Sequence, residues 1–217
     1  MLQKETILPV TLELIKLLQD KEYLKGFNLV GGTAFALYLK HRRSDDIDLF
    51  SNFDFNVSEL IELIQQDFHL KLFHTAANTI KGSIEGTKVD FIAHRYPWLK
   101  EAEEIEGIRL ASLPDLIAMK INAISTSGQR SKDFIDIYYV IEERKYDISE
   151  MVNFFRDKYS QEGDMHIIKS LIYFEDIDLS DWPVLVKNPE LNWEEVKKRI
   201  KKEVLLYMKN EWRRGKR

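Results

Sequence analysis

The sequence lacks cysteine altogether, and this absence excludes several kinds of chemistry. None of its 217 residues can form a disulfide, a thiolate zinc ligand or a cysteine nucleophile, which fits a reducing compartment. Long apolar runs are missing too, since no segment reaches the ~20 apolar residues that span a bilayer. The opening MLQKETILPV has no basic region followed by an apolar run and a cleavage site. We therefore expect a cytoplasmic protein that does not enter the membrane.

Positive charge is not in excess either. The 36 Asp and Glu residues outnumber the 32 Lys and Arg residues, which gives a formal net charge of -4 at pH 7. This balance argues against a protein coated in basic residues for binding nucleic acid. A local basic surface is still compatible with this balance, because basic residues cluster at residues 40–43, at residues 130–132 and in the C-terminal EWRRGKR.

The apolar pattern predicts an α+β protein with two parts. Helical spacing over residues 8–18 precedes FNLVGG, a short buried strand and turn, and TAFALYLKH, a helix that Thr33 is placed to cap. DDIDLF is the next expected strand, and residues 57–68 form a helix for which Ser58 is a cap. Further strands are expected at LKLFHTA, NTIKGSI, KVDFIAH and IRLA.

Helices dominate the remainder of the chain. The Ser112-Leu-Pro-Asp tetrapeptide has the cap and the early proline of a helix start. Further helices are expected near residues 131–143, 148–158, 163–174 and 192–212. We expect a mixed sheet with flanking helices over residues 1–111 and a helical domain over residues 112–217.

Three aspartates on two predicted strands form a candidate metal site. Side chains two residues apart on a strand share a face, so Asp46 and Asp48 point together, away from Ile47 and Leu49. Asp90 lies on a later strand with the same alternation. Carboxylates this close need cations, and Mg²⁺ takes its oxygen ligands from one or two carboxylates, water and phosphate. A solvated sheet face is the alternative for a D-x-D pattern taken alone.

A Gly-Gly-Thr sequence stands one short helix before these aspartates. Gly31, Gly32 and Thr33 join a buried strand to a helix, so their backbone N–H groups form a natural phosphate cradle. One stretch thus offers a phosphate site and metal ligands together.

The predicted helix LPDLIAMKINAI places a lysine on its apolar face. At about 100° per residue, Lys120 falls between Leu113, Leu116 and Ile117, while Asp115 falls on the opposite side. An ammonium there must pair with a phosphate or carboxylate, or its stem must snorkel to a helix edge. In the following helix, Asp133 lies beside the apolar face and Asp136 on the more polar side.

These segments together resemble a known family. GGTAFALYLKHRRSDDIDLF, the Pro-x-Asp-Leu-x-x-x-Lys segment and RSKDFIDIYYV resemble the AbiEii/AbiGii toxin family of the nucleotidyltransferase superfamily, which has a polymerase-beta-like palm. The gap from the glycines to Asp46 is a little longer than in the broader superfamily, and Thr33 replaces its serine. The resemblance covers roughly residues 28–139 and implies a nucleotidyltransferase-like fold for the N-terminal part.

The resemblance also implies a reaction. It implies Mg²⁺-dependent transfer of a nucleotidyl group from an NTP, with two ions, Mn²⁺ being an alternative. Metal ligands are Asp46, Asp48 and Asp90, the last also a candidate base for the acceptor hydroxyl. Lys120 and Asp133 belong to the active site, and the nucleotide-binding residues implied are Gly31, Gly32, Thr33, Lys120 and Lys132.

The same resemblance implies a biological role. The protein is expected to be the toxin of a bacterial toxin–antitoxin or abortive-infection system, with a cognate antitoxin and an RNA acceptor, tRNA in particular. Two alternatives stay open: a small-molecule nucleotidyltransferase of the kind that modifies antibiotics, and a non-catalytic nucleotide-binding protein of the same fold.

Overall fold

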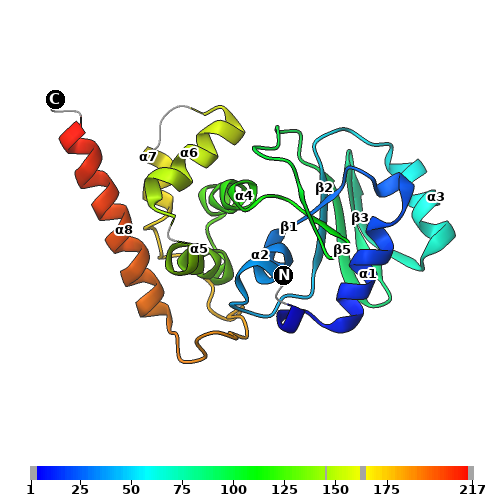
Figure 1. Cartoon of the computed structure of the whole chain (residues 1–217), viewed down its shortest axis with the longest axis horizontal. Coiled ribbons are helices and arrows are strands. Elements are labelled where there is room, and N and C mark those ends of the chain that lie inside the picture. Colours follow the sequence, from blue (N-terminus) through cyan, green and yellow to red (C-terminus); the bar gives the residue numbers. More distant parts are fainter. Residues whose placement is uncertain (1–3, 145, 162–164, 215–217) are drawn as a thin grey trace. The chain divides into compact units, whose positions relative to one another are not determined.

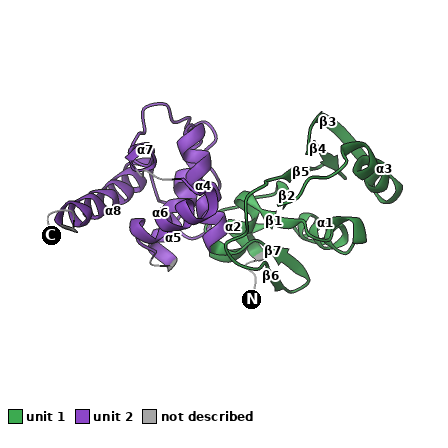
Figure 2. Cartoon of the chain, turned by 90° about the horizontal axis from the view of Figure 1, so that it is seen from above, with its two compact units in different colours: residues 1–113 green, residues 114–217 purple. Residues whose placement is uncertain are grey.

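The computed structural model describes residues 4–144, 146–161 and 165–214. The chain divides into two compact units, Met1–Leu113 (unit 1) and Pro114–Arg217 (unit 2), which Figure 2 colours separately. Within the described residues, every named strand lies in unit 1, and the regular elements of unit 2 are helices. The predicted α+β class, with a mixed sheet followed by helices, is confirmed.

Unit 1 is built on a seven-stranded mixed sheet in the order β3-β4-β5-β2-β1-β7-β6 (Figure 1). Strand β2 pairs in parallel with β5 and antiparallel with β1, and β1 in turn pairs in parallel with β7. The outer pairs β3–β4, β4–β5 and β6–β7 are antiparallel. The strands are β1 (Asn28–Val30), β2 (Ile47–Ser51), β3 (Leu70–Ala76), β4 (Thr79–Ile84), β5 (Thr87–Ala93), β6 (Glu103–Ile105) and β7 (Ile108–Leu110).

Three α-helices and two short 3₁₀-helices accompany the sheet. Helix α1 packs against β7, α2 against β1 and β2, and α3 against β3 and β4. Their bounds are η1 (Lys4–Thr6), α1 (Pro9–Gln19), η2 (Glu22–Leu24), α2 (Gly31–Leu39) and α3 (Val57–Asp67).

Two predicted helix caps are wrong, because neighbouring residues start these helices. Helix α2 begins at Gly31 directly after β1, so Thr33 lies inside its first turn instead of capping it. Helix α3 is capped by Asn56, whose side chain accepts hydrogen bonds from the amides of Ser58 and Glu59. An Asn side chain one residue before the helix reaches these amides, and Ser58 is already helical.

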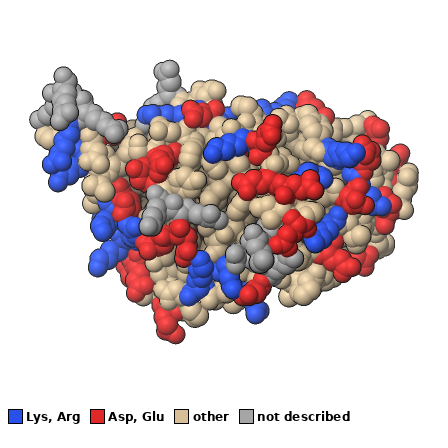
Figure 3. All heavy atoms as spheres, viewed as in Figure 1, with Lys and Arg blue, Asp and Glu red and all other residues tan. Residues whose placement is uncertain are grey.

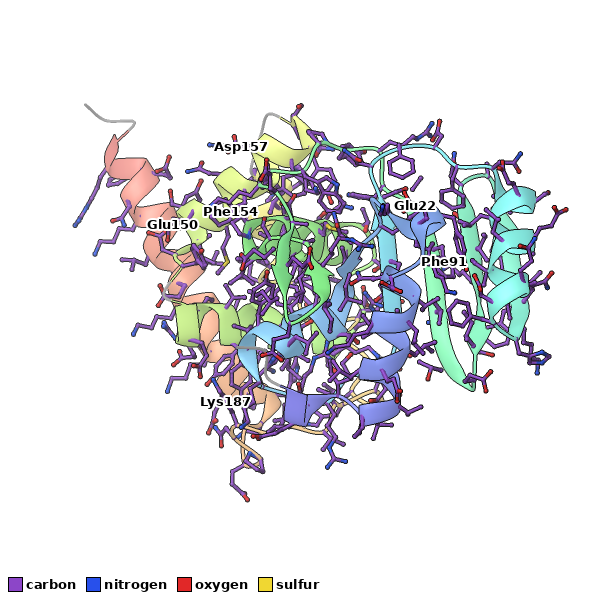
Figure 4. All side chains as sticks on the ribbon, turned by 45° about the vertical axis from the view of Figure 1, so that its right-hand side comes forward. Glu22, Phe91, Glu150, Phe154, Asp157 and Lys187 are labelled. Atoms are coloured by element: carbon purple, nitrogen blue, oxygen red, sulfur yellow. The ribbon has the colours of Figure 1, made fainter. Side chains whose placement is uncertain are left out.

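The centre of the sheet is apolar on one face. Ile47, Leu49, Val89 and Phe91 are fully buried, and the register pairs Ile47 with Val89 and Leu49 with Phe91. Phe91, labelled on β5 in Figure 4, meets the ring of Phe27 edge to face at 6.2 Å, and Phe27 meets the ring of Phe53 in the same way at 5.8 Å. This packing fixes the register of β2 against β5, since a one-residue slip would turn every side chain to the other face.

Unit 2 is a helical unit whose helices follow the predicted segments with one exception. The helix predicted over residues 163–174 ends at Ser170, and its predicted start at residues 163–164 lies outside the described residues. Helix α8 packs against α5 and α6. Asp147 and Glu150 form a capping box at the start of α6, and Figure 4 labels Glu150, Phe154 and Asp157 along this helix. The helices are α4 (Leu113–Thr126), α5 (Ser131–Arg144), α6 (Ile148–Tyr159), α7 (Met165–Ser170) and α8 (Trp193–Arg214).

Two aspartates of unit 2 are buried although both lie outside the apolar stripes of their helices. Asp115 was expected on the polar side of α4, but it is completely buried and pairs with the equally buried Lys158 of α6 at 2.7 Å. Asp136 was expected on the polar side of α5, but it too is completely buried. The exposure expected of a polar side is therefore wrong, because each aspartate has a lysine partner that repays the loss of water, and a helical wheel does not show partners on other helices.

The surface carries both signs of charge. The face seen in Figure 3 shows acidic and basic side chains next to one another, with no extended field of one sign. No helix among residues 4–144, 146–161 and 165–214 is both long and apolar enough to cross a membrane.

Candidate active site

Two of the predicted metal ligands lie side by side in the sheet. Asp48 of β2 and Asp90 of β5 are register partners on neighbouring parallel strands, so their side chains share one face. The opposite face is the buried layer of Ile47, Leu49, Val89 and Phe91. Asp90 is buried and Asp48 is half-buried, whereas the side chain of Asp46, just before β2, is 57% exposed. The sheet therefore brings Asp48 and Asp90 together and leaves Asp46 at its rim.

The start of helix α2 lies directly against Asp48. Gly31 has φ +68°, in the left-handed region, and a Cβ added there would overlap Oδ2 of Asp48 and lie 2.9 Å from its Cγ. Only glycine meets both demands, the positive φ and the close approach of a carboxylate. The two residues named by the sequence, one as a phosphate ligand and one as a metal ligand, are thus in contact.

Gly32 is covered by the side chain of Arg42. A Cβ added to Gly32 would overlap Nη2 of Arg42, would lie 3.3 Å from its Cζ, and would lie 3.1 Å from Oγ of Ser44. Arg42 is only 3% exposed, and its Nη1 donates to the carbonyl of Arg43 at 3.1 Å. A buried guanidinium therefore stands beside the first turn of α2, where the helix amides have no partners within the helix.

The hydroxyl of Thr33 holds this segment together. Its Oγ1 donates to the carbonyl of Asp46 and lies 3.0 Å from Oγ of Ser44. Thr33 is fully buried. The Thr33 side chain, predicted to bind nucleotide, thus links α2 to Asp46, the residue just before β2.

Two lysines neutralise the carboxylates from neighbouring positions. Nζ of Lys81, the register partner of Asp90 on β4, lies 3.3 Å from Oδ2 of Asp90. Nζ of Lys88 on β5 lies 4.0 Å from Oδ2 of Asp46. Both lysine side chains are about half exposed, at 42% and 51%, so their ammonium groups are free to swing into water.

The donors at this site fit a hard cation. Oδ1 of Asp90 is buried and accepts no hydrogen bond from any described residue, although a carboxylate oxygen in such a place needs a partner. Carboxylate oxygens from one or two residues are what Mg²⁺ takes from proteins, the rest of its shell being water and phosphate. Among the described residues no three His, Cys, Asp or Glu side chains converge on one point. The fit thus rests on the pair Asp48 and Asp90.

The remaining predicted residues belong to unit 2. Lys120 on α4 is 7% exposed, and its Nζ lies 2.8 Å from Oδ1 of Asp133 and 2.9 Å from Oδ2 of Asp136. Arg130 donates to the other oxygen of Asp133 at 2.8–2.9 Å. Lys120 therefore does not snorkel: its Nζ lies between two buried carboxylates, the first of the two arrangements that its position allowed.

Lys132 forms its ion pair with a residue outside this cluster. Its Nζ pairs with Asp181 at 2.7 Å, and the two side chains are 29% and 51% exposed. The structure thus joins Lys120 with Asp133 and gives Lys132 a different carboxylate partner.

Several residues at these sites were not predicted. Lys81 and Lys88 join the carboxylate face only through the strand register, which the sequence does not show. Arg42 and Ser44 carried a signal, because they stand in the HRRSDD stretch that leads into the aspartates, yet no role was assigned to them.

The chain is similar in sequence to a described family and to a curated protein. The family profile described as "Nucleotidyl transferase AbiEii toxin, Type IV TA system" matches residues 83–214. This match includes Asp90, Lys120 and Asp133 and begins after Asp48 in the chain. The uncharacterized protein aq_aa25 of Aquifex aeolicus (strain VF5) is 32% identical over 191 residues, which cover 85% of this chain and 89% of that protein.

Solved structures share the fold. A candidate nucleotidyltransferase from H. pylori has a TM-score of 0.55 and 16% identity, with 93% of each chain covered. JHP933 from Helicobacter pylori has a TM-score of 0.53 and 15% identity, with 96% of each chain covered. The predicted family is confirmed: the chain belongs to the AbiEii toxin family, whose members are described with type IV toxin–antitoxin systems, and it is a nucleotidyltransferase.

Proposed function

We propose that this nucleotidyltransferase uses Mg²⁺ to transfer a nucleotidyl group from an NTP to an RNA acceptor of the tRNA class. We further propose that it acts as a toxin and that a cognate antitoxin controls it. The observation that carries the proposal is the contact between Gly31, at the start of α2, and Asp48, which is paired with Asp90 across two parallel strands. A phosphate-binding helix start and two carboxylates then meet at one place, as transfer from a triphosphate requires.

The start of α2 is the proposed site of the terminal phosphates. Amides in the first turn of a helix point outward and favour an anion. The missing side chains of Gly31 and Gly32 allow phosphate oxygens to approach the backbone, and the hydroxyl of Thr33 fixes the turn through Asp46 and Ser44. The chain's own contribution here is positioning, which supplies much of the rate in phosphoryl-type transfer.

Asp48 and Asp90 are the proposed metal ligands, with Asp46 as a third at the rim. Bound Mg²⁺, or Mn²⁺ in its place, would neutralise charge on the triphosphate and on the departing pyrophosphate. The free Oδ1 of Asp90 is placed either to bind the second ion or to take the proton of the acceptor hydroxyl. Lys81 and Lys88 lie beside Asp90 and Asp46 and balance part of their negative charge.

Lys120, Asp133 and Lys132 enter the proposal through the family resemblance. A lysine whose Nζ lies between Asp133 and Asp136 is fixed in position, which suits a phosphate contact. The proposals of an RNA acceptor and of a cognate antitoxin rest on the same family resemblance. The local basic clusters of the sequence are compatible with an RNA backbone.

The test is transfer of label from each α-labelled NTP to total bacterial RNA with Mg²⁺. The double variant Asp46→Asn, Asp48→Asn removes two proposed metal ligands. Asp45→Asn is the matched control, because Asp45 is adjacent and its Oδ1 accepts from the amide of Leu8 at 3.2 Å, a bond that an asparagine oxygen also makes.

The expected result is a labelled band of tRNA size with the unchanged protein and with Asp45→Asn, and none with the double variant or after chelation of Mg²⁺. Labelled products of small-molecule size, with unlabelled RNA, would overturn the RNA acceptor and favour the antibiotic-type enzyme. Mg²⁺-dependent NTP binding without any labelled product would overturn transfer itself and favour a nucleotide-binding protein.

A further inference from the structure

Unit 2 contains a pocket that the proposed reaction leaves without a role. Its volume is about 540 Å³, within the range of about 300–1,000 Å³ typical of ligand sites. One wall is the end of α4 and the turn after it, and the other is α7 and the segment after it. The lining residues used below are Ser125, Thr126, Ser127, Lys169, Tyr173 and Asp176.

The pocket walls are tied to each other. The amide of Asp178 donates to the carbonyl of Gln129 at 2.8 Å, and a β-bridge joins Arg130 to Asp178. The turn after α4 and the segment after α7 are therefore linked beside the pocket. A pre-formed site of this kind spends little binding energy on ordering its walls.

Three hydroxyl groups give one wall a defined hydrogen-bonding character. Oγ of Ser125 and Oγ1 of Thr126 donate to the carbonyl of Asn122 at 3.0 and 2.8 Å, and Oγ of Ser127 donates to the carbonyl of Ala123 at 3.0 Å. A hydroxyl that has donated its one proton still offers oxygen lone pairs. The wall therefore presents acceptors, which match ligand N–H groups such as the amino groups of adenine, cytosine and guanine.

The opposite wall offers an aromatic face and a cation. Tyr173 as a whole residue is 48% exposed, and its hydroxyl is hydrogen-bonded to Asp176, a bond that raises the pKa of Tyr173. The bond anchors the ring while its face stays accessible for stacking. The exposed Lys169, one turn earlier in the chain, brings a positive charge to the same wall.

We propose that this pocket binds an unpaired base of the RNA acceptor. The base stacks on Tyr173, its amino group donates to the hydroxyl oxygens, and Lys169 contacts the adjoining phosphate. This combination of an aromatic platform, hydrogen bonds to base edges and a cation is how single-stranded nucleic acid is bound. The inference rests on the proposed function, because it names a binding site for the proposed acceptor.

The pocket is also joined to residues that the family resemblance places in the active site. Gly128 lines the pocket, and two residues later Arg130 pairs with Asp133, which pairs with Lys120. An RNA base held in the pocket therefore lies at the start of a chain of ion pairs that ends at Lys120. This connection favours an acceptor over an unrelated ligand.

The test measures binding of a short unstructured oligoribonucleotide, labelled at one end, to the full chain by fluorescence anisotropy. Tyr173→Ala should weaken binding about tenfold, since stacking on one aromatic is worth about 1–3 kcal/mol. Tyr173→Phe keeps the stacking face and should stay within about threefold of the unchanged protein. Lys169→Gln should lower the slope of log affinity against log salt by about one.

A tyrosine of similar exposure in unit 1 serves as the matched control. Tyr96 is 41% exposed, and Tyr96→Ala should leave the affinity unchanged. Equal losses in Tyr173→Ala and Tyr96→Ala, or no loss in Tyr173→Ala, would overturn the pocket proposal. Thermal unfolding of each variant, followed by circular dichroism, identifies a variant that loses binding only because it no longer folds.

A second measurement separates this inference from the proposed function. In the labelling assay with RNA, Tyr173→Ala should raise KM for RNA about tenfold with kcat unchanged. If the unchanged protein labels no RNA, the proposed acceptor is wrong, whereas the anisotropy series still reports on the pocket. If RNA is labelled and KM does not respond to Tyr173→Ala, the pocket assignment alone is wrong.

Discussion

Gly31→Ala tests whether the start of α2 and the carboxylate pair form one site. The change adds a single methyl group at a residue with φ +68° whose Cβ would overlap Oδ2 of Asp48. We expect Asp48 to rotate away from its position beside Asp90. The matched control is Gly86→Ala, since Gly86 has φ +81° in the same unit and its added Cβ would meet nothing within 4 Å.

The two glycines separate backbone strain from the steric effect. Holding an L-residue in the left-handed region costs about 1–2 kcal/mol, a cost that both variants share. Gly31→Ala adds the cost of forcing Asp48 out of its rotamer, about 0.5–1.5 kcal/mol. We therefore expect a loss in the free energy of unfolding of about 1–2 kcal/mol for Gly86→Ala and about 2–3 kcal/mol for Gly31→Ala.

The assays are urea unfolding and transfer of label from an NTP. Gly31→Ala should lose most of its activity, and Gly86→Ala should keep it, because only the first displaces Asp48. Introducing Gly31→Ala into an Asp48→Ala background should cost about 1 kcal/mol less than in the unchanged protein, since the clash has been removed. Equal stability losses for the two glycines, with activity intact in Gly31→Ala, would refute the reasoning.

Three further predictions concern unit 2. Lys120→Met should abolish transfer and lower the free energy of unfolding by about 3–5 kcal/mol, because two buried carboxylates lose their shared cation. Transfer assays and urea unfolding measure these two effects, and intact activity would contradict the prediction. Asp115→Leu should lower the free energy of unfolding by about 3–5 kcal/mol, because it leaves the Lys158 ammonium buried without this carboxylate. Adding Lys158→Met should restore most of that stability in urea unfolding, and a double variant no more stable than Asp115→Leu would contradict the pairing. Burial raises the pKa of Tyr139 to about 12, so between pH 10 and 12 the unfolded chain loses the proton first and stability falls with rising pH, by up to about 1.4 kcal/mol per pH unit. Thermal unfolding across that range should be less pH-dependent in Tyr139→Phe, and an unchanged slope would refute the assignment.

Much of the fold could be predicted because its signals are local. The apolar periods of 2 and 3.6 residues located the long helices of unit 2 and six of the seven strands. Strand β6 was missed, since Glu103–Ile105 is three residues long, mostly charged and exposed, and exists only by pairing with β7. Short polar strands carry no alternation that a sequence reading can detect.

The site could be predicted as far as its residues act within one element. Alternation placed Asp48 and Asp90 on the faces opposite Leu49 and Phe91, and the structure pairs the two aspartates in register. The contacts between elements were invisible: Asp115 was assigned to the polar side of its helix although its partner, Lys158, lies on another helix 43 residues later. Burial of a charge is decided by such distant partners, so a helical wheel locates the residue on its helix but does not show whether that side is buried.

The charge balance of the carboxylate face ties these observations to function. Asp48, Asp90 and Asp46 face the two ammonium groups of Lys81 and Lys88, so these five side chains together keep about one negative charge without a cation. A divalent ion that binds Asp90 must therefore displace only the half-exposed ammonium of Lys81, which returns to water at little cost. Once displaced, that ammonium stays on the same face of the sheet as the triphosphate proposed at α2, where it adds to the positive charge instead of competing for the carboxylate. Lys81→Met should accordingly tighten Mg²⁺ binding in the absence of nucleotide, and should weaken NTP binding when Mg²⁺ is saturating. Calorimetric titrations with Mg²⁺ and with NTP measure the direction of each change in affinity. Weaker Mg²⁺ binding in the variant would show that Lys81 supports the carboxylate instead of competing for it.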